Sequence, residues 1–412
     1  MSSEILFIAH RIPFPPNRGD KIRSHHILKR LTRLAPVHVA CFADDDADMA
    51  EEVELAAIAH SYRLVRRSKP LVYAGVQALA KHCPVSLTAF DDAALKDYVA
   101  GVLASGKVGT VYVFSGQMGQ YVPKDFAGRV IVDFVDVDSA KFDAYAERKS
   151  GPMAWVDARE GRMLRAEESR LADRADISLL ISHKEAELFT SRLQGSAVQT
   201  AKVDVLGNGI DSDFFDPAQV CPEPQLTAMA GPRLIFTGQM DYQPNIAAAE
   251  RVATRILPLV RQKIPQASFH VVGRNPTDRL LAMHKQGGVF VWGRVDDVRP
   301  WLKGADMAVA PLEIARGVQN KVLEAMAMAM PVVLTGAAAT GINAVPGHHF
   351  EIADSDAELA AAIVDLAQDS RRAAVMGLDA RRFVVERQSW QSALEPLAQL
   401  FAGNRRAQRN AA

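Results

Sequence analysis

The chain has 412 residues, with 48 Lys and Arg against 48 Asp and Glu, so its formal net charge is zero. A single hydrophobic core rarely grows past about 250 to 300 residues, which predicts two domains of about 200 residues each. A neutral chain has no global field that would attract nucleic acid or an anionic membrane, and any such partner requires a local patch. The 26 glycines and 21 prolines exclude collagen-like and broadly disordered chains.

Cysteine usage and the N-terminal sequence point to a reducing compartment. Cys41, Cys83 and Cys221 form no CxxC pair and no Cys/His cluster, so neither a disulfide framework nor a structural zinc site is indicated. The sequence MSSEILFIAHRIP lacks the features of a signal peptide and predicts a buried first strand. Residues 325–347 carry no charge, but Pro and Gly divide them into a helix end, a strand and a loop, so we expect no membrane span. The expected location is cytoplasmic.

In the first half of the chain, short apolar runs alternate with helical stretches, which is typical of βαβ units around a parallel sheet. The predicted strands are residues 5–9, 37–42, 62–65, 111–114, 130–135, 177–181 and 203–206. Helices are predicted at residues 20–34 and 153–175. Residues 208–232 contain four prolines and are expected to form an interdomain linker.

A second alternating series follows the linker. Its predicted strands are residues 234–237, 268–272, 289–292, 307–310 and 332–334, and its later helical patterns are 356–367, 371–386 and 390–401. The sequence therefore predicts an α/β protein with two Rossmann-like, doubly wound parallel-sheet domains, residues 1–207 and 233–385, facing across a cleft. Residues 386–412 form a C-terminal helix and polar tail, and whether the helix packs back on the first domain stays open. Ligands of open sheets bind beyond the carboxyl ends of the strands.

The most informative segment is residues 310–333, APLEIARGVQNKVLEAMAMAMPVV, which predicts a strand end, a loop, a helix and the next strand. Apolar residues at helical spacing mark its buried face: Val322, Leu323, Met326, Ala329 and Met330. Gly317 would lie at the helix start, where free N–H groups and the helix dipole favour an anion such as a diphosphate. Arg316 and Lys321 flank that end, and Glu324 is placed to accept hydrogen bonds from two vicinal hydroxyls. The alternative is a solvated helix face with a Lys321–Glu324 ion pair.

These motifs resemble the GT4 family of retaining glycosyltransferases with the GT-B fold. GVQNKVLEAMAMAMPVV is similar to that family's donor-binding segment, and PFPPNRGDKIRSHHILKRL, ADRADISLLISHKEAELF and FTGQMDYQPN stand in the expected order. DFVDVDS and ARGVQNKVLEAMA also resemble exopolysaccharide sugar transferases associated with PEP-CTERM/exosortase systems. The resemblance implies transfer of a sugar from a nucleotide-diphosphate sugar to a hydroxyl acceptor with retention, without a metal or other cofactor. The implied role is bacterial exopolysaccharide or other cell-surface glycan biosynthesis, with a glycan or lipid-linked glycan as acceptor.

The resemblance also implies the donor-binding residues. They are Gly19, Gly238, Arg274, Gly293, Arg294, Val295, Gly317, Gln319, Asn320, Lys321 and Glu324. Glu324 corresponds to the glutamate at the nucleotide ribose, and Lys321 lies where the diphosphate is held. Gly19 corresponds to the loop glycine near the donor phosphates, and residues 293–295 to the nucleobase pocket. The loop after Gly238 lacks the family's basic residues, so Arg316, Lys321 and Arg274 are the candidate sources of positive charge.

The expected catalytic residues are Arg316, Lys321, Asp136 and Asp138. Arg316 and Lys321 would stabilise charge on the departing diphosphate. Arg316 replaces a family glutamate and cannot accept hydrogen bonds from the sugar, so the sugar identity is not transferred. Within DFVDVD, residues 133–138, Asp136 and Asp138 fit three roles: lining the cleft, capping locally, or chelating a divalent cation.

Two further questions concern partners and reaction class. The helix at residues 20–34 carries five Lys or Arg residues and one Asp, which fits either peripheral contact with the inner membrane surface or a solvated face. The rival functions are a nucleotide-sugar 2-epimerase of similar fold and a non-catalytic nucleotide-sugar-binding partner. A nicotinamide dehydrogenase is disfavoured because the first strand is followed by HRIPFPPNRGD, without GxGxxG. The oligomeric state is not indicated.

Overall fold

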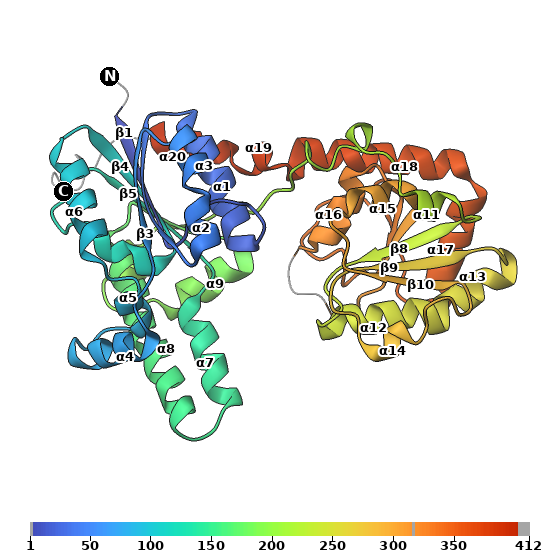
Figure 1. Ribbon diagram of the computed structural model, residues 1–412, viewed down its shortest axis with the longest axis horizontal. Helices are drawn as coiled ribbons and strands as arrows, with labels where there is room; N and C mark the ends of the chain where they lie inside the picture. The colour runs from blue at the N-terminus through green and yellow to red at the C-terminus, as the bar shows by residue number, and fades with distance from the viewer. Residues whose placement is uncertain (1–2, 315–317, 403–412) are drawn as a thin grey trace. The chain divides into compact units, whose positions relative to one another are not determined.

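A computed structural model describes residues 3–314 and 318–402 of the chain. The chain divides into two compact units. Unit 1 comprises residues 1–208 together with 394–412, and unit 2 comprises residues 209–393. Each unit contains one parallel sheet with helices packed around it (Figure 1).

The sheet of unit 1 has seven parallel strands in the order β3-β2-β1-β4-β5-β6-β7. Their bounds are β1 Glu4–Ala9, β2 Val37–Ala43, β3 Ser61–Arg66, β4 Val108–Phe114, β5 Arg129–Val135, β6 Ile177–Leu180 and β7 Val203–Val205. The central strand β1 is buried on both faces, which explains its continuous apolar run. It pairs with β2 and β4 on its two sides, with Phe7 opposite Val39 and Tyr112.

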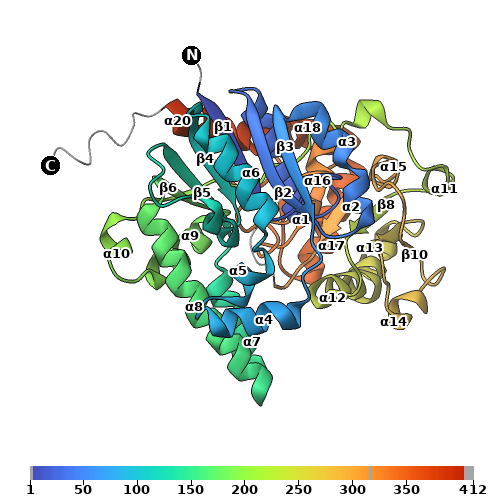
Figure 2. The same cartoon turned by 60° about the vertical axis from the view of Figure 1, so that its left-hand side comes forward.

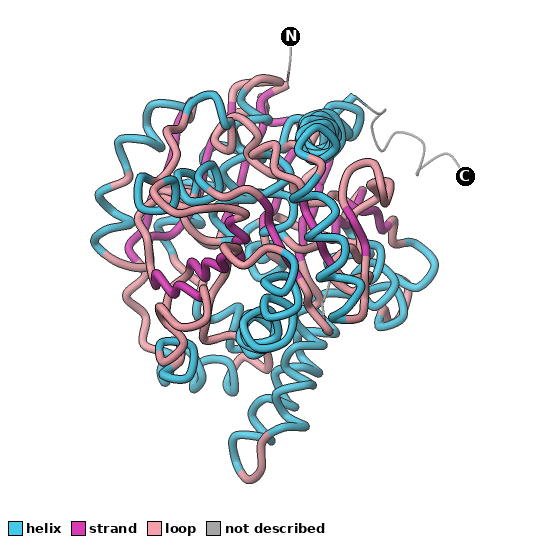
Figure 3. The backbone as a smooth tube through the Cα atoms, turned by 90° about the vertical axis from the view of Figure 1, so that its right-hand side faces the viewer, coloured by secondary structure: helices cyan, strands magenta, loops and turns pink. Residues whose placement is uncertain are grey.

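The helices of unit 1 follow the strands along the chain. Their bounds are α1 Gly19–Thr32, α2 Asp46–Ala50, α3 Glu52–Ile58, α4 Leu71–Ala80, α5 Val85–Ala89, α6 Ala93–Ala104, η1 Gly116–Tyr121, α7 Asp138–Arg148, α8 Pro152–Arg174, α9 His183–Arg192, α10 Ala197–Thr200 and α20 Glu395–Ala402. Helices α7 and α8 pack as an antiparallel pair joined by a short loop, and Figure 3 shows this hairpin extending beyond the strands. Helix α20 belongs to unit 1, where the Leu400 carbonyl accepts a hydrogen bond from Arg129.

The sheet of unit 2 has six parallel strands in the order β10-β9-β8-β11-β12-β13. Their bounds are β8 Arg233–Thr237, β9 Ser268–Val272, β10 Val289–Gly293, β11 Met307–Ala310, β12 Val332–Leu334 and β13 Glu351–Ile352. The helical elements of unit 2 are η2 Pro217–Gln219, α11 Pro224–Thr227, α12 Gln243–Arg251, η3 Val252–Ile256, α13 Leu257–Lys263, α14 Asp278–Leu281, α15 Arg299–Gly304, α16 Asn320–Ala327, α17 Asp356–Gln368, α18 Ser370–Phe383, η4 Val384–Gln388 and α19 Trp390–Ala393. The two-residue strand β13 is too short to carry a sequence pattern.

Two segments differ from the sequence-based expectation. Residues 209–232 are not a free linker: they are part of unit 2, where Leu226 is fully buried and Ile210 exchanges backbone hydrogen bonds with Gln388 and Trp390. The expected helix at residues 390–401 is two helices, α19 and α20, separated at Leu394, where unit 1 resumes. Both short helices bury apolar side chains, so the apolar pattern continues across the break. The sequence pattern therefore does not reveal the boundary between the two units at Leu394.

Helix α1 is anchored to unit 1 by buried ion pairs. Arg23 is 1% exposed, and its guanidinium donates two hydrogen bonds of 3.1 Å to the fully buried carboxylate of Asp133 on β5. Arg23 also donates to the Asn208 side-chain oxygen at 2.8 Å, which fixes the chain where it leaves unit 1. Lys21 is buried as well, with its amino group 2.5 Å from Asp48. Lys21 and Arg23, two of the five basic residues expected on a solvated or membrane-facing helix, are therefore buried in ion pairs inside unit 1.

Within residues 3–314 and 318–402, no helix combines the length and the apolar character that crossing a bilayer requires.

Candidate functional site

In each sheet the strand order reverses beside the unit's first strand. In unit 1, β1 lies between β2 and β4, and in unit 2, β8 lies between β9 and β11. The loops that leave the carboxyl ends of two such neighbouring strands diverge to opposite faces of the sheet and open a crevice, where open α/β sheets bind ligands. In unit 2 the expected donor-binding residues that the structure describes lie at the carboxyl ends of β8, β9 and β10 and at the start of α16.

Three glycines close the carboxyl ends of neighbouring strands in unit 2. Gly238 donates to the Val272 carbonyl at 3.1 Å, and Gly273 donates to the Gly293 carbonyl at 2.8 Å. A Cβ atom on Gly273 would lie 1.6 Å from the Gly238 carbonyl oxygen, and Gly238 itself has a φ of 150°. Gly273 has no room for a side chain because backbone packs directly on backbone there, and Gly238 adopts a φ that side chains disfavour. A Cβ atom on Gly238 would also lie 2.9 Å from the Asn245 side-chain nitrogen and 3.3 Å from the Lys321 side chain, so glycine leaves room for these two groups.

Lys321 connects α16 with α12 at the crevice in unit 2. It lies in the first turn of α16, and its amino group donates to the Asn245 side-chain oxygen on α12 at 2.6 Å. The Asn245 amide in turn donates to the Gln239 carbonyl at 2.8 Å, in the loop that follows Gly238. The ammonium also lies 5.0 Å from the centroid of the Phe236 ring. Burial lowers the pKa of Lys321 to about 8, which leaves the side chain mainly charged at neutral pH.

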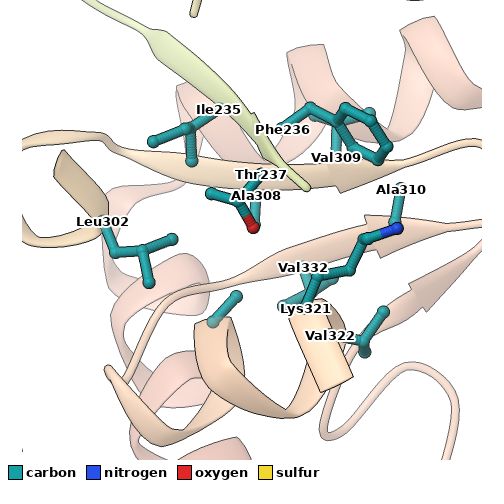
Figure 4. A pocket seen from close by; sticks show the side chains of 11 residues that line it. Ile235, Phe236, Thr237, Leu302, Ala308, Val309, Ala310, Lys321, Val322 and Val332 are labelled. Atoms are coloured by element: carbon teal, nitrogen blue, oxygen red, sulfur yellow. The ribbon is translucent and has the colours of Figure 1, made fainter. Parts of the chain in front are cut away.

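The space beside Lys321 is small and lined mainly by apolar side chains. Figure 4 shows the lysine extending from α16 toward Ala310 at the end of β11, among side chains that include Ile235, Val309 and Val332. The cavity among these residues measures about 10 Å³, which is the smallest volume that holds a single water molecule. A ligand of Lys321 therefore has to reach the ammonium from the loop side, at the sheet edge.

Glu324 follows one helical turn after Lys321, on the same side of α16. It is half-buried, and burial raises its pKa to about 7, while the positive charge of Lys321 opposes the rise. Among the described residues, its carboxylate accepts no hydrogen bond from another side chain or from the backbone. A buried carboxylate without a donor is costly unless a ligand supplies one. Glu324 is therefore an acceptor available for the hydroxyl groups of a ligand.

The start of α16 differs from the expectation. The helix begins at Asn320, with Gln319 in extended backbone as its N-cap, three residues after the predicted start at Gly317. Arg316 and Gly317 lie outside the described residues, so the structure does not place the expected second cation. The predicted buried face is present, since Val322, Leu323 and Met326 are all below 3% exposed.

Arg274 and Arg294 are both exposed, after the glycines that end β9 and β10. With the Gln239 amide in the orientation that its neighbours favour, its side-chain oxygen accepts hydrogen bonds from the Arg274 guanidinium. Gln239 thus connects Arg274 to the same loop that holds the partner of Lys321, and these two cations share one edge of the sheet. Arg294 has no such link to this loop, and Val295 is half-buried against the core of unit 2.

In unit 1, Gly19 is the first residue of α1 and is exposed. A Cβ atom at this position would meet nothing within 4 Å, and its φ is not in the left-handed region. The fold of unit 1 therefore does not require glycine at position 19.

Asp136 and Asp138 both form ion pairs with one lysine, Lys141. Lys141 on α7 donates to Asp136 at 2.9 Å and to Asp138 at 3.1 Å, and these carboxylates raise its pKa. Asp138 is the first residue of α7, where a carboxylate also interacts favourably with the helix dipole. An ammonium thus occupies the position between the two carboxylates that a chelated cation would take. The geometry favours local ion pairing over metal binding, and neither aspartate caps α7, whose N-cap is Val137.

The sequence analysis missed a polar cluster at the carboxyl end of β1. Arg11 donates to Asp20 at 2.6 Å and to Asp44 at 2.5 Å, and the His10 ring nitrogen Nε2 lies 3.2 Å from Asp20. The cluster lowers the pKa values of both carboxyls, chiefly through the hydrogen bonds from His10 to Asp20 and from Arg11 to Asp44 against the cost of burial. The sequence could have indicated this cluster, because His10 and Arg11 directly follow the first strand, and ligands of open sheets bind beyond the carboxyl ends of the strands.

Comparison with known protein families gives a match within unit 2. Residues 231–369 match the family model of Glycosyl transferases group 1. The GDP-mannose-dependent alpha-(1-6)-phosphatidylinositol monomannoside mannosyltransferase of Mycolicibacterium smegmatis is 27% identical over 262 residues, which cover 58% of this chain and 65% of that protein. The chain thus spans just under two thirds of the length of this relative.

Solved structures are similar over nearly the whole chain. Alr3699/HepE of Anabaena in complex with UDP has a TM-score of 0.60 and 14% identity, covering 97% of this chain and 99% of that one. Sucrose-phosphate synthase of Thermosynechococcus elongatus has a TM-score of 0.60 and 16% identity, covering 100% of both chains. At these identities the likeness concerns the fold. The predicted α/β fold of GT-B type, with two Rossmann-like parallel-sheet domains, is confirmed.

Proposed function

We propose that the protein is a glycosyltransferase that binds a nucleotide-diphosphate sugar on unit 2 and transfers the sugar to a hydroxyl acceptor. The observation that carries the proposal is the pair formed by Lys321 and Glu324. A cation held by Asn245 and a carboxylate without a donor lie one helical turn apart at the switch point of the sheet. A nucleoside diphosphate matches both, with its phosphates at Lys321 and its ribose hydroxyls at Glu324. The family match of residues 231–369 supports this assignment.

The chemistry assigned to these residues is stabilisation of the leaving group. The bond between the anomeric carbon and the diphosphate oxygen breaks, and negative charge grows on the diphosphate beside Lys321. A bond forms between the acceptor oxygen and the anomeric carbon, and the acceptor proton passes to an oxygen of the departing diphosphate. Both events occur on one face of the sugar, so the anomeric configuration is retained without an enzyme nucleophile. Arg274 is placed to add a second positive charge, and the reaction assigns no role to a metal ion.

We place the reaction in bacterial exopolysaccharide or other cell-surface glycan biosynthesis, because DFVDVDS and ARGVQNKVLEAMA resemble transferases of that group. UDP and GDP are the two candidate nucleotides of the donor. Alr3699/HepE is solved with UDP, and the mycobacterial relative is GDP-mannose-dependent. Residues 293–295, which correspond to the family's nucleobase pocket, are the proposed place where this protein distinguishes between UDP and GDP.

Thermal unfolding with a nucleotide panel tests the donor site. We expect either UDP or GDP to raise the melting temperature, whereas uridine and guanosine have no effect, because Lys321 binds the diphosphate. A ligand at a hundred times its Kd stabilises a folded protein by about 2.7 kcal/mol, which is readily measured. EDTA should leave the shift unchanged. The absence of a shift with every nucleoside diphosphate, or an equal shift with the nucleosides, would contradict the proposal.

Incubation of the donor sugar without an acceptor tests the reaction class. A transferase releases little nucleoside diphosphate until an acceptor hydroxyl is present. Conversion of the donor sugar to its 2-epimer would identify an epimerase, and donor binding with no turnover across an acceptor panel would identify a non-catalytic binding partner.

Donor affinity is expected to be highest between about pH 7 and 8. Glu324 has to be ionised to accept hydroxyl hydrogen bonds, and its raised pKa of about 7 means that affinity falls as the pH drops below 7. Lys321 has to be protonated to attract the diphosphate, and its lowered pKa of about 8 means that affinity falls as the pH rises above 8. Titration calorimetry with UDP and GDP from acid to alkaline pH measures both limbs. Because the two groups interact, the limbs report the pair.

The variant Glu324→Gln separates these two limbs. Glutamine does not titrate, so the acid limb should disappear while the alkaline limb remains. Glu313→Gln is the matched control, because Glu313 is exposed and precedes the same helix. An acid limb that persists in Glu324→Gln would assign it to another group and remove Glu324 from the donor site.

A further inference from the structure

Helix α4 of unit 1 has an inverted distribution of side chains. Its ten residues, LVYAGVQALA, include no charged residue. Two alanines, Ala74 and Ala78, face the core, whereas the large apolar side chains face solvent and are 52% to 81% exposed: Leu71, Val72, Tyr73, Val76 and Leu79. Surface helices of soluble proteins normally bury such residues and expose polar ones. An apolar face of this kind marks a surface that binds another apolar phase.

The tip of the α7–α8 hairpin adds to the same region of unit 1. Met153 and Trp155, in the first turn of α8, are 55% and 58% exposed. One turn after Trp155, the Arg159 guanidinium donates to the carbonyl oxygens of Ala78 and Cys83, at the end of α4. This contact holds the start of α8 beside the end of α4, and Figures 1 and 2 both show the two helices as neighbours.

Two cations without a carboxylate partner flank the apolar face. Residues 61–84, which include α4, contain five Lys or Arg residues and no Asp or Glu, but Arg66, Arg67 and Lys81 pair with Asp46, Asp44 and Asp91. Lys69, before α4, donates to the carbonyl oxygens of Thr88 and Asp91, and Arg159 donates to carbonyl oxygens at the other end. Neither cation takes part in an ion pair within the described chain. Lys69 and Arg159 therefore place one positive charge without a carboxylate partner near each end of α4.

We propose that α4, with Met153 and Trp155 of α8, docks unit 1 on an anionic lipid bilayer. The apolar side chains of α4 enter the interface between headgroups and acyl chains, and the helix lies parallel to the membrane. Tyr73 and Trp155 take the headgroup level, which aromatic side chains with a polar atom prefer. Lys69 and Arg159 interact with anionic headgroups. A second copy of this chain is a poorer match, because two such faces would bring their positive charges together.

Helix α1 does not offer this surface, although its sequence is the more basic. Lys21 and Arg23 are buried in ion pairs, and none of the large apolar side chains of α1 is exposed. The docking surface is independent of the donor chemistry proposed for unit 2.

Flotation of the full chain with lipid vesicles tests the inference. We expect binding to vesicles of phosphatidylcholine with phosphatidylglycerol, weaker binding to phosphatidylcholine alone, and loss of binding at high salt. The double variant Val72→Asp/Val76→Asp should reduce the partition coefficient at least about tenfold, because two apolar anchors are replaced by carboxylates that anionic lipid repels. Both positions are exposed, so the melting temperature should not change.

The matched control is Val375→Asp/Leu378→Asp, which places the same charges at exposed apolar positions of α18 in unit 2. This variant should bind vesicles as the wild type does. Equal loss of binding in both double variants, or wild-type protein that binds no vesicle, would overturn the assignment. A dimer in sedimentation that Val72→Asp/Val76→Asp dissociates, without vesicle binding, would assign the face to a second copy of the chain and also overturn it.

Discussion

Replacing Lys321 by methionine is expected to lower kcat/KM for sugar transfer by roughly 10² to 10³, the usual effect of removing one preorganised group that stabilises transition-state charge. Methionine preserves most of the side-chain volume above the small apolar cavity and removes the ammonium. The loss should be larger in kcat than in substrate binding, because charge on the diphosphate grows as the sugar departs. Initial rates of nucleoside diphosphate release, with donor and acceptor varied, measure the effect.

Two companion variants isolate the charge. Lys321→Arg keeps the positive charge with a different shape, so it should retain more activity than the methionine variant. Lys303→Met is the matched control, since Lys303 is an exposed lysine on α15 of the same unit and should be dispensable. Full activity in Lys321→Met, with an unchanged melting temperature, would remove Lys321 from the reaction.

Most of the strands could be predicted from the sequence. A strand of a parallel sheet is buried on both faces and therefore appears as a continuous apolar run. All seven predicted strands of unit 1, and five of the six strands in the sheet of unit 2, overlap predicted runs, and only β13 has no predicted counterpart. Helix α4 was not predicted, and its apolar residues give no hint of their exposure. Hydrophobicity shows which side chains avoid water in isolation, but only the packing of Ala74 and Ala78 shows which face of α4 is turned inward.

The candidate site was predictable where its residues lie close in sequence. Lys321 and Glu324 are three residues apart, so helical spacing places them on one side of α16. Asn245, which holds Lys321, is 76 residues away, and the two meet only because β8 and β11 are neighbours in the sheet. The linking of Asp136 and Asp138 by Lys141 is local, yet three roles were compatible with the sequence. The position of the lysine amino group argues against one of them, chelation of a divalent cation.

The buried pair of Arg23 and Asp133 gives the second large effect. Asp133→Ala is expected to lower the free energy of unfolding by about 3 to 5 kcal/mol, because it leaves the Arg23 guanidinium buried without its counter-ion. The hydroxyl of Tyr112, which donates to Asp133 at 2.9 Å, would lose its acceptor as well. Urea unfolding followed by circular dichroism measures the change. Asp136→Ala is the control, since that aspartate lies on the same strand end and is only half-buried.

The double variant Arg23→Met/Asp133→Leu shows whether the pair or the volume matters. Removing both charges leaves no unpaired ion, so the double variant should be more stable than Asp133→Ala. It should remain below the wild type, because Arg23 also holds Asn208 at 2.8 Å and Gly207 at 3.3 Å, where the chain leaves unit 1. Destabilisations that simply add in the double variant would contradict a coupled pair. In that case the cost of each change would come from lost packing around α1 and β5, not from an uncompensated charge.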